Sequence, residues 1–369
     1  MATARRKLAV ICGHAPVPRE SFIRRDLESL GDSFDIRVFG LGKNIPSISA
    51  VPLLRHYPPL TALRLALRLR TVRDIADFVG NGGLILAHFA WLTADIASAA
   101  AQLAGCPWIS FVHAWDVFTR PPHEIARRLS TASKVIACSD LAAQAVRAAG
   151  LPEKHVEVIH HGIDFAKMPK RCPNGQPSVL AVGRLVPKKG FDILLRAWPS
   201  VVDAFPQATL EIIGDGPCAR QLANLAQQCP HGSVRLTGER SEEETLNAIA
   251  EASLLVLPSK RLPNGDRDGI ANVILEAMAI GIPVITTDAG AAGEVIRDGE
   301  TGILLPSPLT PSSLADAICG LLSDTDRQYR LAANARRTVL PAFDSRVTSA
   351  QLKESLFLVN RRLRADQPY

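Results

Sequence analysis

The segment "DGIANVILEAMAIGIPVITT", residues 268–287, is an apolar run that carries two carboxylates. Asn272 is a favourable N-cap residue, and the aliphatic residues 273–280 predict a short helix. Gly281 and Pro283 predict the end of that helix, because glycine is preferred there and proline cannot continue it. The letters "PVITT" then have the composition of a buried strand. The segment therefore predicts one helix followed directly by one strand.

The two carboxylates of this segment need partners of their own. Asp268 precedes the predicted helix, and Glu276 lies about one turn into it. Unpaired N–H groups in the first turn of a helix favour an anion such as phosphate, whereas a carboxylate only accepts hydrogen bonds and suits sugar hydroxyls. A sugar nucleotide would satisfy both. Two solvated charges that stabilise the helix N-terminus explain the segment equally well.

The alternation of strand and helix extends outward from this segment through most of the chain. In the first half, strands are predicted at residues 7–13, 34–41, 83–90 and 107–116, with helices between them. Residues 165–178 contain three prolines and one glycine and predict a linker, after which the alternation restarts at residue 179. Such alternation predicts parallel sheets with helices on both faces. Two similar halves joined by a linker predict a ligand in a cleft between strand ends.

Length and composition limit the classes of protein. A chain of 369 residues exceeds the usual single domain, and 47% hydrophobic with 21% charged residues is typical of a globular protein. The seven cysteines are scattered without a CxxC pair, which fits a reducing cytoplasm. The first apolar run, of five residues, is too short for a signal peptide, and none approaches a transmembrane helix. We therefore expect a cytoplasmic protein.

The basic charge balance points to an anionic partner. The net charge is +6, but lysine and arginine are spread along the chain, so we expect an anionic small molecule or a membrane surface and no nucleic acid. Residues 55–73 alternate leucine and arginine at near-helical spacing. They predict a basic amphipathic helix suited to peripheral contact with the inner face of a membrane. A core-packed helix with a solvated arginine face is an equal alternative.

A cationic loop follows the first strand of the second half. In "VGRLVPKKGFD", residues 182–192, Arg184 follows the strand and Lys189 precedes Gly190 at the next helix. Two cations at this point would lie on either side of a diphosphate, and helix N–H groups would assist them. We favour this reading over a basic surface loop because the loop lies at a strand C-terminus.

Glycines end two other strands at similar positions. In "IIGDGP", Gly214 and Gly216 would allow a ligand to approach the backbone closely, although an ordinary turn explains them by itself. The spacing is not GxGxxG, so no dinucleotide fingerprint is predicted. Gly13, after the first predicted strand of the chain, is a further ligand-binding candidate.

Histidines end strands of the first half. His113 and Asp116 in "FVHAWD" follow a predicted strand, where a histidine facing a cleft would orient a substrate hydroxyl. A histidine with a purely structural role is the alternative, and we expect Trp115 to pack internally. The adjacent histidines of "HHGID" form a poor chelating pair without an obvious third ligand, so we predict no metal site.

The second half resembles glycosyltransferase family 4, the retaining enzymes of the GT-B fold. The resemblance rests on "VGRLVPKKGFD", "IIGDGP", "LTG", "LVLPS" and residues 268–305, which together cover most of residues 179–325. The first half resembles the acceptor domain of that family through "RESFIRRDLESL", "AHFAW", "FVHAWDVF" and "VIHHGID". The resemblance implies two Rossmann-like doubly wound domains that face each other across a cleft, with a C-terminal helix that crosses back. The implied boundaries are residues 1–165 with 341–369 for acceptor binding, 166–178 for the linker and 179–340 for donor binding.

The resemblance also implies roles for individual residues. Seven residues separate Asp268 from Glu276, and the family carries two glutamates at this spacing. Glu276 corresponds to the glutamate that holds the nucleotide ribose, whereas Asp268 replaces the glutamate that contacts the transferred sugar. Arg184 and Lys189 correspond to the cations at the diphosphate, and His113 to the histidine near the reacting sugar. The implied donor-binding set is Gly13, Gly214, Gly216, Ile270, Ala271, Asn272, Val273 and Glu276.

The implied activity is hexosyl transfer from a UDP- or GDP-sugar to a hydroxyl on a glycan, a lipid-linked acceptor or a small molecule. The resemblance implies retention of configuration without a cofactor or a divalent metal, since Arg184 and Lys189 would take the charge of the leaving diphosphate. A GT-B sugar-nucleotide epimerase and a non-catalytic sugar-nucleotide-binding subunit are the alternatives. The shortened carboxylate Asp268 leaves the identity of the donor sugar open.

Overall fold

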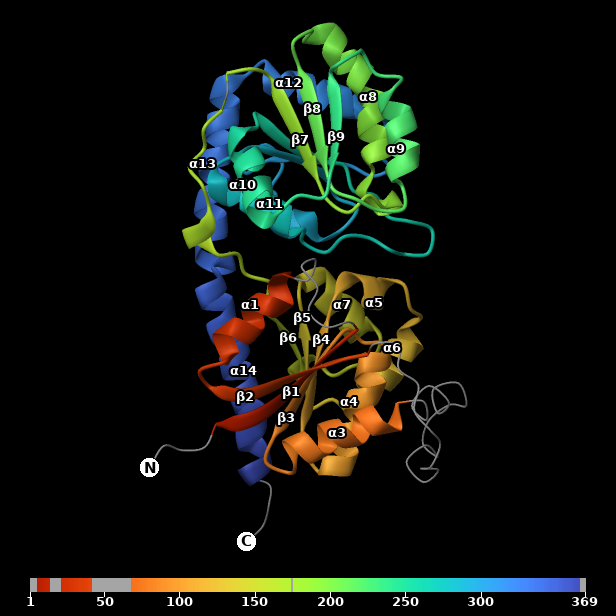
Figure 1. Ribbon diagram of the computed structural model, residues 1–369, viewed down its shortest axis with the longest axis vertical. Helices are drawn as coiled ribbons and strands as arrows, with labels where there is room; N and C mark the ends of the chain where they lie inside the picture. Colours follow the sequence, from red (N-terminus) through yellow and green to blue (C-terminus); the bar gives the residue numbers. More distant parts are fainter. Residues whose placement is uncertain (1–4, 14–20, 42–67, 174, 366–369) are drawn as a thin grey trace. The chain divides into compact units, whose positions relative to one another are not determined.

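The computed structural model describes residues 5–13, 21–41, 68–173 and 175–365, which form two compact units (Figure 1). The first unit comprises residues 1–162 and 346–369, and the second comprises residues 163–345. By this division, the residues 166–178 that were expected to form a linker belong to the second unit.

The first unit is built on a parallel six-stranded sheet in the order β2-β1-β3-β4-β5-β6. Its strands are β1 (Arg6–Cys12), β2 (Phe34–Gly40), β3 (Leu84–His88), β4 (Trp108–Val112), β5 (Lys134–Ala137) and β6 (Val156–Val158). Its helices are α1 (Ser21–Leu30), α3 (Leu69–Val79), α4 (Leu92–Ala104), α5 (Ala114–Phe118), α6 (Pro122–Leu129), α7 (Asp140–Ala148) and α14 (Ser345–Ala365). Because all strands are parallel, their C-terminal ends meet at one edge of the sheet.

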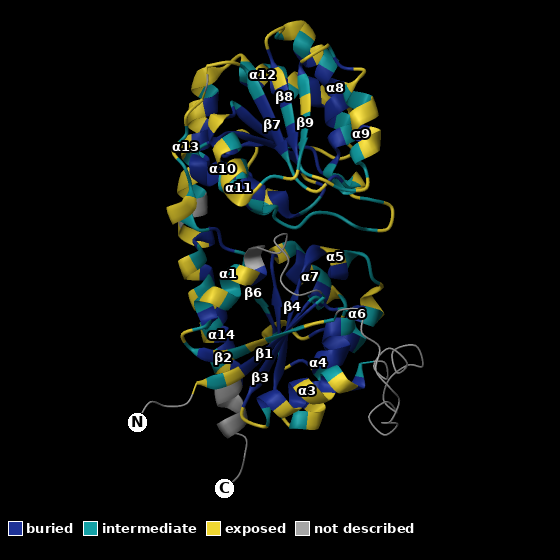
Figure 2. Cartoon of the chain, viewed as in Figure 1, coloured by how far each residue is buried: buried dark blue, intermediate teal, exposed yellow. Residues whose placement is uncertain are grey.

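The central strands of this sheet are buried on both faces (Figure 2). On one face, Ile85 and Ala87 of β3 pack in a core with α3, α4 and α7. On the other face, Leu84 and Leu86 pack in a second core with Leu352 and other side chains of α14. Burial on both faces explains why these strands are continuous apolar runs rather than alternating ones.

The second unit contains a parallel six-stranded sheet in the order β12-β11-β10-β7-β8-β9. Its strands are β7 (Ser178–Val182), β8 (Thr209–Ile213), β9 (Val234–Gly238), β10 (Leu254–Leu257), β11 (Val284–Thr287) and β12 (Ile303–Leu305). Its helices are α8 (Phe191–Ala204), α9 (Ala219–Ala226), α10 (Glu242–Glu251), α11 (Asn272–Ile280), α12 (Pro311–Leu322) and α13 (Thr325–Phe343). One large apolar core surrounds this sheet, with Trp198 among its fully buried side chains.

The C-terminal helix α14 packs on the first unit although it follows the second in sequence (Figure 1). Leu352, Leu356 and Val359 are buried in the core of the first unit, and the rings of Phe357 and Phe34 stack with 5.0 Å between centroids. The predicted fold, two doubly wound α/β sheets with a helix that returns to the first, is therefore confirmed.

The structure corrects the predicted start of the helix in the opening segment. Helix α11 begins at Asn272, so Ala271 takes the N-cap position with an extended backbone (φ −72°, ψ 127°) and makes no side-chain cap bond. Asn272 was expected to be the cap and is instead the first helical residue. The end of the helix is as predicted, because Gly281 adopts the left-handed conformation and donates its N–H to the carbonyl of Ala277.

The predicted basic amphipathic helix over residues 55–73 falls largely outside the described residues. Its last part enters α3, in which Leu69 and Val72 are buried while Arg70 and Arg73 are exposed. This described part matches a core-packed helix with solvated arginines. Within the described ranges, no helix has both the length and the apolar character needed to cross a membrane.

Candidate active site

With the exception of Gly13, which follows β1 in the first unit, the predicted donor-binding residues lie at the C-terminal edge of the second sheet. Strand β7 lies between β10 and β8, so the connections from the two sides of the sheet diverge at the gap between β7 and β10. Doubly wound sheets bind ligands at such a switch point. Gly183 and Arg184 follow β7 at this gap, and Ser259 follows β10.

Lys189 and Asp268 meet at this point. Lys189 ends a short turn of 3-10 helix (Pro187–Lys189), and its Nζ donates to Oδ2 of Asp268 at 2.8 Å. The hydroxyl of Ser259 donates to the same oxygen at 2.6 Å. Nζ of Lys188 lies 3.7 Å from the other oxygen, Oδ1, and 2.9 Å from Oδ1 of Asp266. Two lysines and one hydroxyl therefore fix the orientation of the Asp268 carboxylate.

The charge of Asp268 is maintained by these neighbours. Burial acts to raise the pKa of its carboxyl, but the positive charges of Lys189 and Lys188 and the hydrogen bonds from Lys189 and Ser259 outweigh it and hold the pKa below the ordinary value. Asp268 is therefore ionised at neutral pH. The site presents a fixed carboxylate beside two ammonium groups.

Two glycines, Gly183 and Gly290, allow tight packing around the ion pair of Lys189 and Asp268. A Cβ at Gly183 would lie 3.3 Å from Cε of Lys189, so the lysine stem passes directly over this glycine. A Cβ at Gly290 would lie 2.2 Å from the carbonyl oxygen of Asp268. That carbonyl also accepts the N–H of Ala291 at 3.2 Å. The loop after β11 therefore packs directly against the backbone of Asp268.

The glycines of "IIGDGP" allow two neighbouring loops of the chain to pack closely against each other. A Cβ at Gly214 would lie 2.0 Å from the carbonyl oxygen of Gly183, and one at Gly216 would lie 2.5 Å from that of Leu185. Their contacts lock the loop after β8 against the loop after β7. The close approach predicted for these glycines is therefore made to the neighbouring loop, which carries Arg184.

Arg184 differs from Lys189 in its surroundings. Its side chain is exposed, and it forms no ion pair with any residue that the structure describes. Its carbonyl accepts the N–H of Val186 at 2.8 Å, which turns the chain sharply after β7. The guanidinium therefore keeps its hydrogen-bonding capacity for a ligand.

The remaining predicted donor-binding residues surround the start of α11. Glu276 is half-buried in the second turn of the helix. Val273 is buried in the core of the second unit, so it would meet a ligand only through its backbone, whereas Ile270 and Ala271 are partly buried against that core. Because the N-cap is an alanine, no side chain caps the first turn of α11. Its N–H groups remain suited to an anion.

The predicted histidine of the first unit belongs to a chain of three. Nε2 of His113 lies 3.4 Å from Nδ1 of His88, and Nδ1 of His113 lies 3.2 Å from Nε2 of His161. These residues follow or end β4, β3 and β6, so they meet at the C-terminal edge of the first sheet. The ring of Phe111 stacks against all three. Both ring nitrogens of His113 thus face another histidine.

Burial keeps the three rings neutral. It is the largest cause of the low pKa of each: about 3 for His88, about 3 for His161 and well below the ordinary value for His113. A neutral imidazole has one donor and one acceptor nitrogen, so the proton position on His113 is linked to those on its two neighbours. The sequence singled out His113, but nothing in it indicated that His88 would be a direct partner.

Asp116 fixes the backbone around His113. One of its carboxylate oxygens accepts the N–H of His113 at 2.8 Å, and the other accepts the N–H of Ala90. The carboxyl is fully buried, and burial raises its pKa to about 7 against the opposing effect of these hydrogen bonds. Next to Ala90, Phe89 has a positive φ of 73°, and its ring lies 4.3 Å from that of His113. Strained non-glycine residues of this kind gather at functional sites.

A cysteine and a predicted glycine also lie at the C-terminal edge of the first sheet. Cys138 brings a thiol near His113 and His161, so that ligand atoms of the three lie within 4.8 Å of one another, a grouping that the sequence did not indicate. Both nitrogens of His113 are already placed for hydrogen bonds to histidines, and the absence of a metal remains a prediction. Gly13 directly follows β1 at the same edge.

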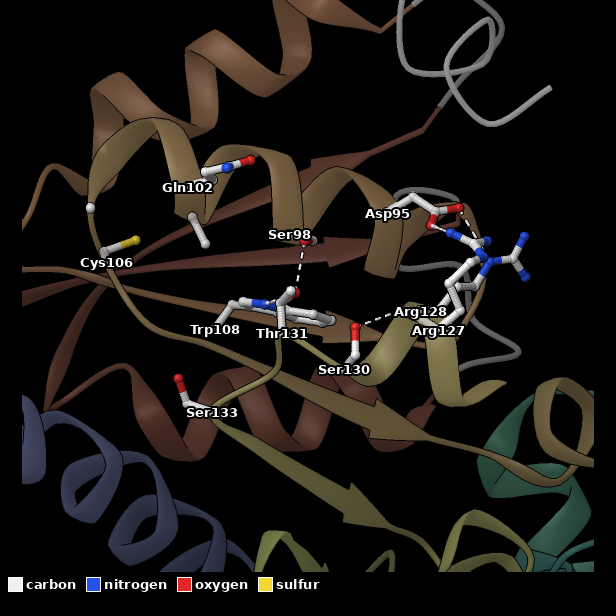
Figure 3. A pocket seen from close by; sticks show the side chains of 12 residues that line it. Asp95, Ser98, Gln102, Cys106, Trp108, Arg127, Arg128, Ser130, Thr131 and Ser133 are labelled. Carbon is white, nitrogen blue, oxygen red and sulfur yellow. Dashed lines mark hydrogen bonds and ion pairs between the residues drawn. The ribbon is translucent and has the colours of Figure 1, made fainter. Parts of the chain in front are cut away.

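A cavity of about 530 Å³ in the first unit lies between α4 and α6 (Figure 3). The Ser98 and Thr131 hydroxyls are 2.8 Å apart, and the Trp108 indole donates to Thr131 at 3.2 Å. Ser133 and Trp108 lie at the starts of β5 and β4, the edge opposite to the histidines. The polar groups of this part of the cavity are paired with one another, and it is not where the predicted residues gather.

Two known families match the chain, one over each unit. Residues 176–324 match the family described as Glycosyl transferases group 1, and residues 23–167 match Glycosyltransferase Family 4. The first range contains Arg184, Lys189, Asp268 and Glu276, and the second contains His113. Each compact unit therefore matches its own family of transferase domains.

Individual relatives extend the match over both units. The glycogen synthase of Mycobacterium tuberculosis is 29% identical over 324 residues, which cover 83% of this chain and 75% of the relative. A GDP-mannose-dependent alpha-(1-6)-phosphatidylinositol monomannoside mannosyltransferase of the same species is 34% identical over 194 residues, 52% of this chain and 50% of the relative. The crystal structure of Anabaena Alr3699/HepE in complex with UDP-glucose has a TM-score of 0.74 at 22% identity, covering 95% of this chain and 99% of that one. This structural likeness supports the GT-B fold.

Proposed function

The chain belongs to glycosyltransferase family 4, and from this premise we propose that it moves a hexose from a nucleotide-sugar donor to an acceptor hydroxyl with retention of anomeric configuration. The donor would be a UDP- or GDP-sugar, as in the mannosyltransferase relative, whose name specifies GDP-mannose, and in the HepE complex, which holds UDP-glucose. We place the reaction in polysaccharide, lipid-linked glycan or glycosylated metabolite synthesis.

The ion pair between Lys189 and Asp268 carries this proposal. A nucleotide sugar joins its sugar to a diphosphate through one glycosidic bond, so groups that hold the sugar and the adjacent phosphate must be neighbours. Lys189 is the proposed phosphate contact, Asp268 is the proposed sugar contact, and their charged atoms lie 2.8 Å apart. A donor bound here would place the bond that breaks beside both residues.

The leaving diphosphate would be stabilised by cations of the chain. Nζ of Lys189 has three N–H groups, so its bond to Asp268 leaves donors for a phosphate oxygen. Arg184 would contribute its guanidinium, and the uncapped first turn of α11 would contribute N–H groups. Fixed donors of this kind stabilise charge that develops in the transition state. The proposal therefore requires no divalent metal at the diphosphate.

The transfer itself would take place on one face of the sugar. The bond between the anomeric carbon and the diphosphate oxygen breaks, and the acceptor hydroxyl oxygen bonds to the same carbon from the same side. The hydroxyl proton passes to the departing phosphate oxygen. Glu276 would hold the ribose of the nucleotide.

A donor assay tests this proposal directly. Purified enzyme is incubated with a panel of UDP-, GDP- and ADP-sugars without acceptor, and release of nucleoside diphosphate is followed together with the configuration of the released sugar. Slow release from one donor, with the anomeric configuration retained at first, is the expected result. An altered sugar still attached to its nucleotide would indicate an epimerase instead. Tight nucleotide-sugar binding without any turnover, even with an acceptor panel, would indicate a binding subunit.

A further inference from the structure

Two tryptophans and one arginine form a cluster at the C-terminal edge of the first sheet. Trp91 follows β3 by a short turn, Trp115 lies in α5, and Arg120 comes just after α5. Trp115 was expected to pack internally, but 41% of its surface is exposed. Trp115 lies in the first turn of α5, which follows β4 at the end of the sheet where doubly wound folds bind ligands.

The cluster is held by stacking on the arginine. Cζ of Arg120 lies 3.6 Å from the ring centroid of Trp91 and 5.3 Å from that of Trp115. The two indole rings meet nearly edge to face, with 6.4 Å between centroids and 79° between planes. Stacking uses the face of the guanidinium, whose N–H groups lie in its plane. The arginine therefore keeps donors for a ligand while it stacks on the rings.

The charge of Arg120 distinguishes it from a neighbouring arginine. Arg128 also stacks on Trp91, at 4.5 Å, but it is paired with Asp95 at 3.2 Å and Glu124 at 2.9 Å. Arg120 forms no ion pair within the described part of the chain, although its charge acts on the nearby Asp116 carboxyl and opposes the rise in pKa that burial causes there. Its buried Nε has no hydrogen-bond partner among the described residues. One stacked arginine is thus ion-paired with two carboxylates, whereas the other forms no such ion pair with the described residues.

The cluster is tied to His113 through Asp116. The Asp116 carboxylate accepts N–H groups of His113 and of Ala90, the residue before Trp91. Trp115 lies between His113 and Asp116 in sequence, so the same buried carboxylate fixes both tryptophans and the histidine. The aromatic cluster is therefore a rigid neighbour of the predicted sugar-contacting residue.

We propose that Trp115 and Arg120 form the acceptor subsite, and that the acceptor is a sugar bearing an anionic group, either phosphate or carboxylate. This inference rests on the proposed transfer to a hydroxyl acceptor. The exposed indole would pack against the C–H face of the acceptor ring, and the guanidinium would bind its anionic group by charge-assisted hydrogen bonds. The anion would form with Arg120 the direct ion pair that none of the described carboxylates makes.

Ligand binding to the full chain tests the proposal without an identified acceptor. Glucose 1-phosphate, glucuronic acid, methyl glucoside and inorganic phosphate are titrated by calorimetry, and UDP is titrated as a measure of the donor site. We expect at least one anionic sugar to bind about 10-fold or more tightly than methyl glucoside, as a charged hydrogen bond would provide. The phosphate and carboxylate probes decide which anionic group is preferred. Equal binding of neutral and anionic sugars would overturn the proposal.

Substitutions of Arg120 and Trp115 test whether these residues cause the preference for an anionic sugar. Arg120→Gln should remove most of the preference for the anionic sugar, Arg120→Lys should retain part of it, and Trp115→Ala should weaken both sugars several-fold, all with unchanged UDP affinity. Arg127→Gln is the matched control, since Arg127 pairs with Asp95 and, among the described residues, stacks on neither Trp91 nor Trp115. An anion preference that survives Arg120→Gln, or that Arg127→Gln reduces equally, contradicts the proposed subsite. A chain that binds UDP and releases it from a donor but shows no anion preference would refute this inference alone. Absence of nucleotide binding would instead count against the proposed function.

Discussion

Lys189 and Asp268 face each other from two different loops of the second sheet, with 2.8 Å between Nζ and Oδ2. Lys189 follows β7, whereas Asp268 precedes α11. Because Ser259 and Lys188 hold the same carboxylate, the pair is part of a fixed network rather than a mobile surface contact. Its members differ in the substrate group that each is proposed to touch, so their substitution should give different kinetic results.

Asp268→Asn should lower turnover while leaving the affinity for UDP intact. Free UDP has no sugar for Asp268 to hold, and loss of the carboxylate releases Lys189 toward the phosphates. A charged hydrogen bond contributes on the order of 1.5–3 kcal/mol, so turnover should fall by roughly 10- to 150-fold. Asp266→Asn is the matched control, because Asp266 lies in the same loop and its carboxylate pairs with Lys188 but with no other cation of the described residues. A parallel fall in UDP affinity and turnover in the Asp268 variant would show that the residue acts on the loop alone.

Asp268→Glu should change the ranking of donors. The longer side chain restores the length usual in the family and brings the carboxylate closer to the transferred sugar. Steady-state kinetics on several UDP- and GDP-sugars would compare wild type with this variant. If the order of kcat/KM among donors is the same in both, Asp268 does not contact the sugar.

Arg184→Ala and Lys189→Ala should each reduce turnover by roughly 10²-fold, as removal of a transition-state charge partner does. Their effects on stability should differ. Arg184 is exposed, so its loss should leave the free energy of unfolding unchanged, whereas loss of Lys189 weakens the support of a buried carboxylate and should cost about 1–3 kcal/mol. Urea unfolding and initial rates give both quantities. Arg235→Ala, an exposed arginine at the start of β9, controls for charge, and near wild-type turnover in both test variants would place the diphosphate elsewhere.

Glu276→Ala should weaken nucleotide binding more than it slows the chemical step. A ribose contact is equally good in the ground state and the transition state, so it contributes to affinity rather than to turnover. Calorimetric titration with UDP and GDP, alongside kcat, measures the two effects separately. Unchanged affinity for both nucleotides would remove Glu276 from the ribose site.

The fold followed closely from the sequence because both sheets are parallel and buried on both faces. Such strands are continuous apolar runs bounded by glycine and proline, as in "PVITT" and residues 83–90, and they are easily located. The start of α11 was misplaced by one residue, since the good capping residue Asn272 lies one position after the residue that takes the N-cap. Local preference for a cap was overridden by the packing of the preceding loop.

The contacts among the predicted site residues could not be foreseen from the sequence. Lys189 and Asp268 were both identified, but the sequence separation of their loops concealed that they form an ion pair. Lys188, adjacent to Lys189, carries no signal that distinguishes it from a solvated lysine. His88 ends an apolar strand and would pass for a buried structural residue. Contacts between loops at the end of a parallel sheet depend on strand order, which a single sequence does not specify.

Chelation of divalent metals should leave activity unchanged. Arg184, Lys189 and the first turn of α11 are proposed to stabilise the diphosphate without a metal. Initial rates would be measured with and without an excess of EDTA, followed by addition of Mg²⁺ or Mn²⁺. A complete loss of activity that metal restores would overturn this part of the mechanism.

Burial of His88 should make the folded protein lose stability as the pH falls. His88 is 1% exposed, and burial lowers its pKa from 6.5 to about 3. Between these values the unfolded chain binds a proton at His88 that the folded chain does not, so the free energy of unfolding falls as the pH falls. One such group contributes at most about 1.4 kcal/mol per pH unit in this window. Asp26 and Asp116 act in the opposite direction, because burial raises the pKa of each to about 7.

His88→Asn removes this titration and keeps a polar group near the position of Nδ1, opposite Nε2 of His113. Asp26 and Asp116 are present in both proteins, so their effects cancel in the comparison. Urea unfolding at about pH 7.5, 6 and 5 should show the variant losing stability less steeply than wild type below about pH 6.5, by up to about 1.4 kcal/mol per pH unit. His123→Asn, at an exposed position on α6, should follow the wild-type dependence. If the His88 variant and wild type lose stability in parallel over this range, His88 takes up protons equally in the folded and unfolded chains, and the histidine chain is not held neutral by burial.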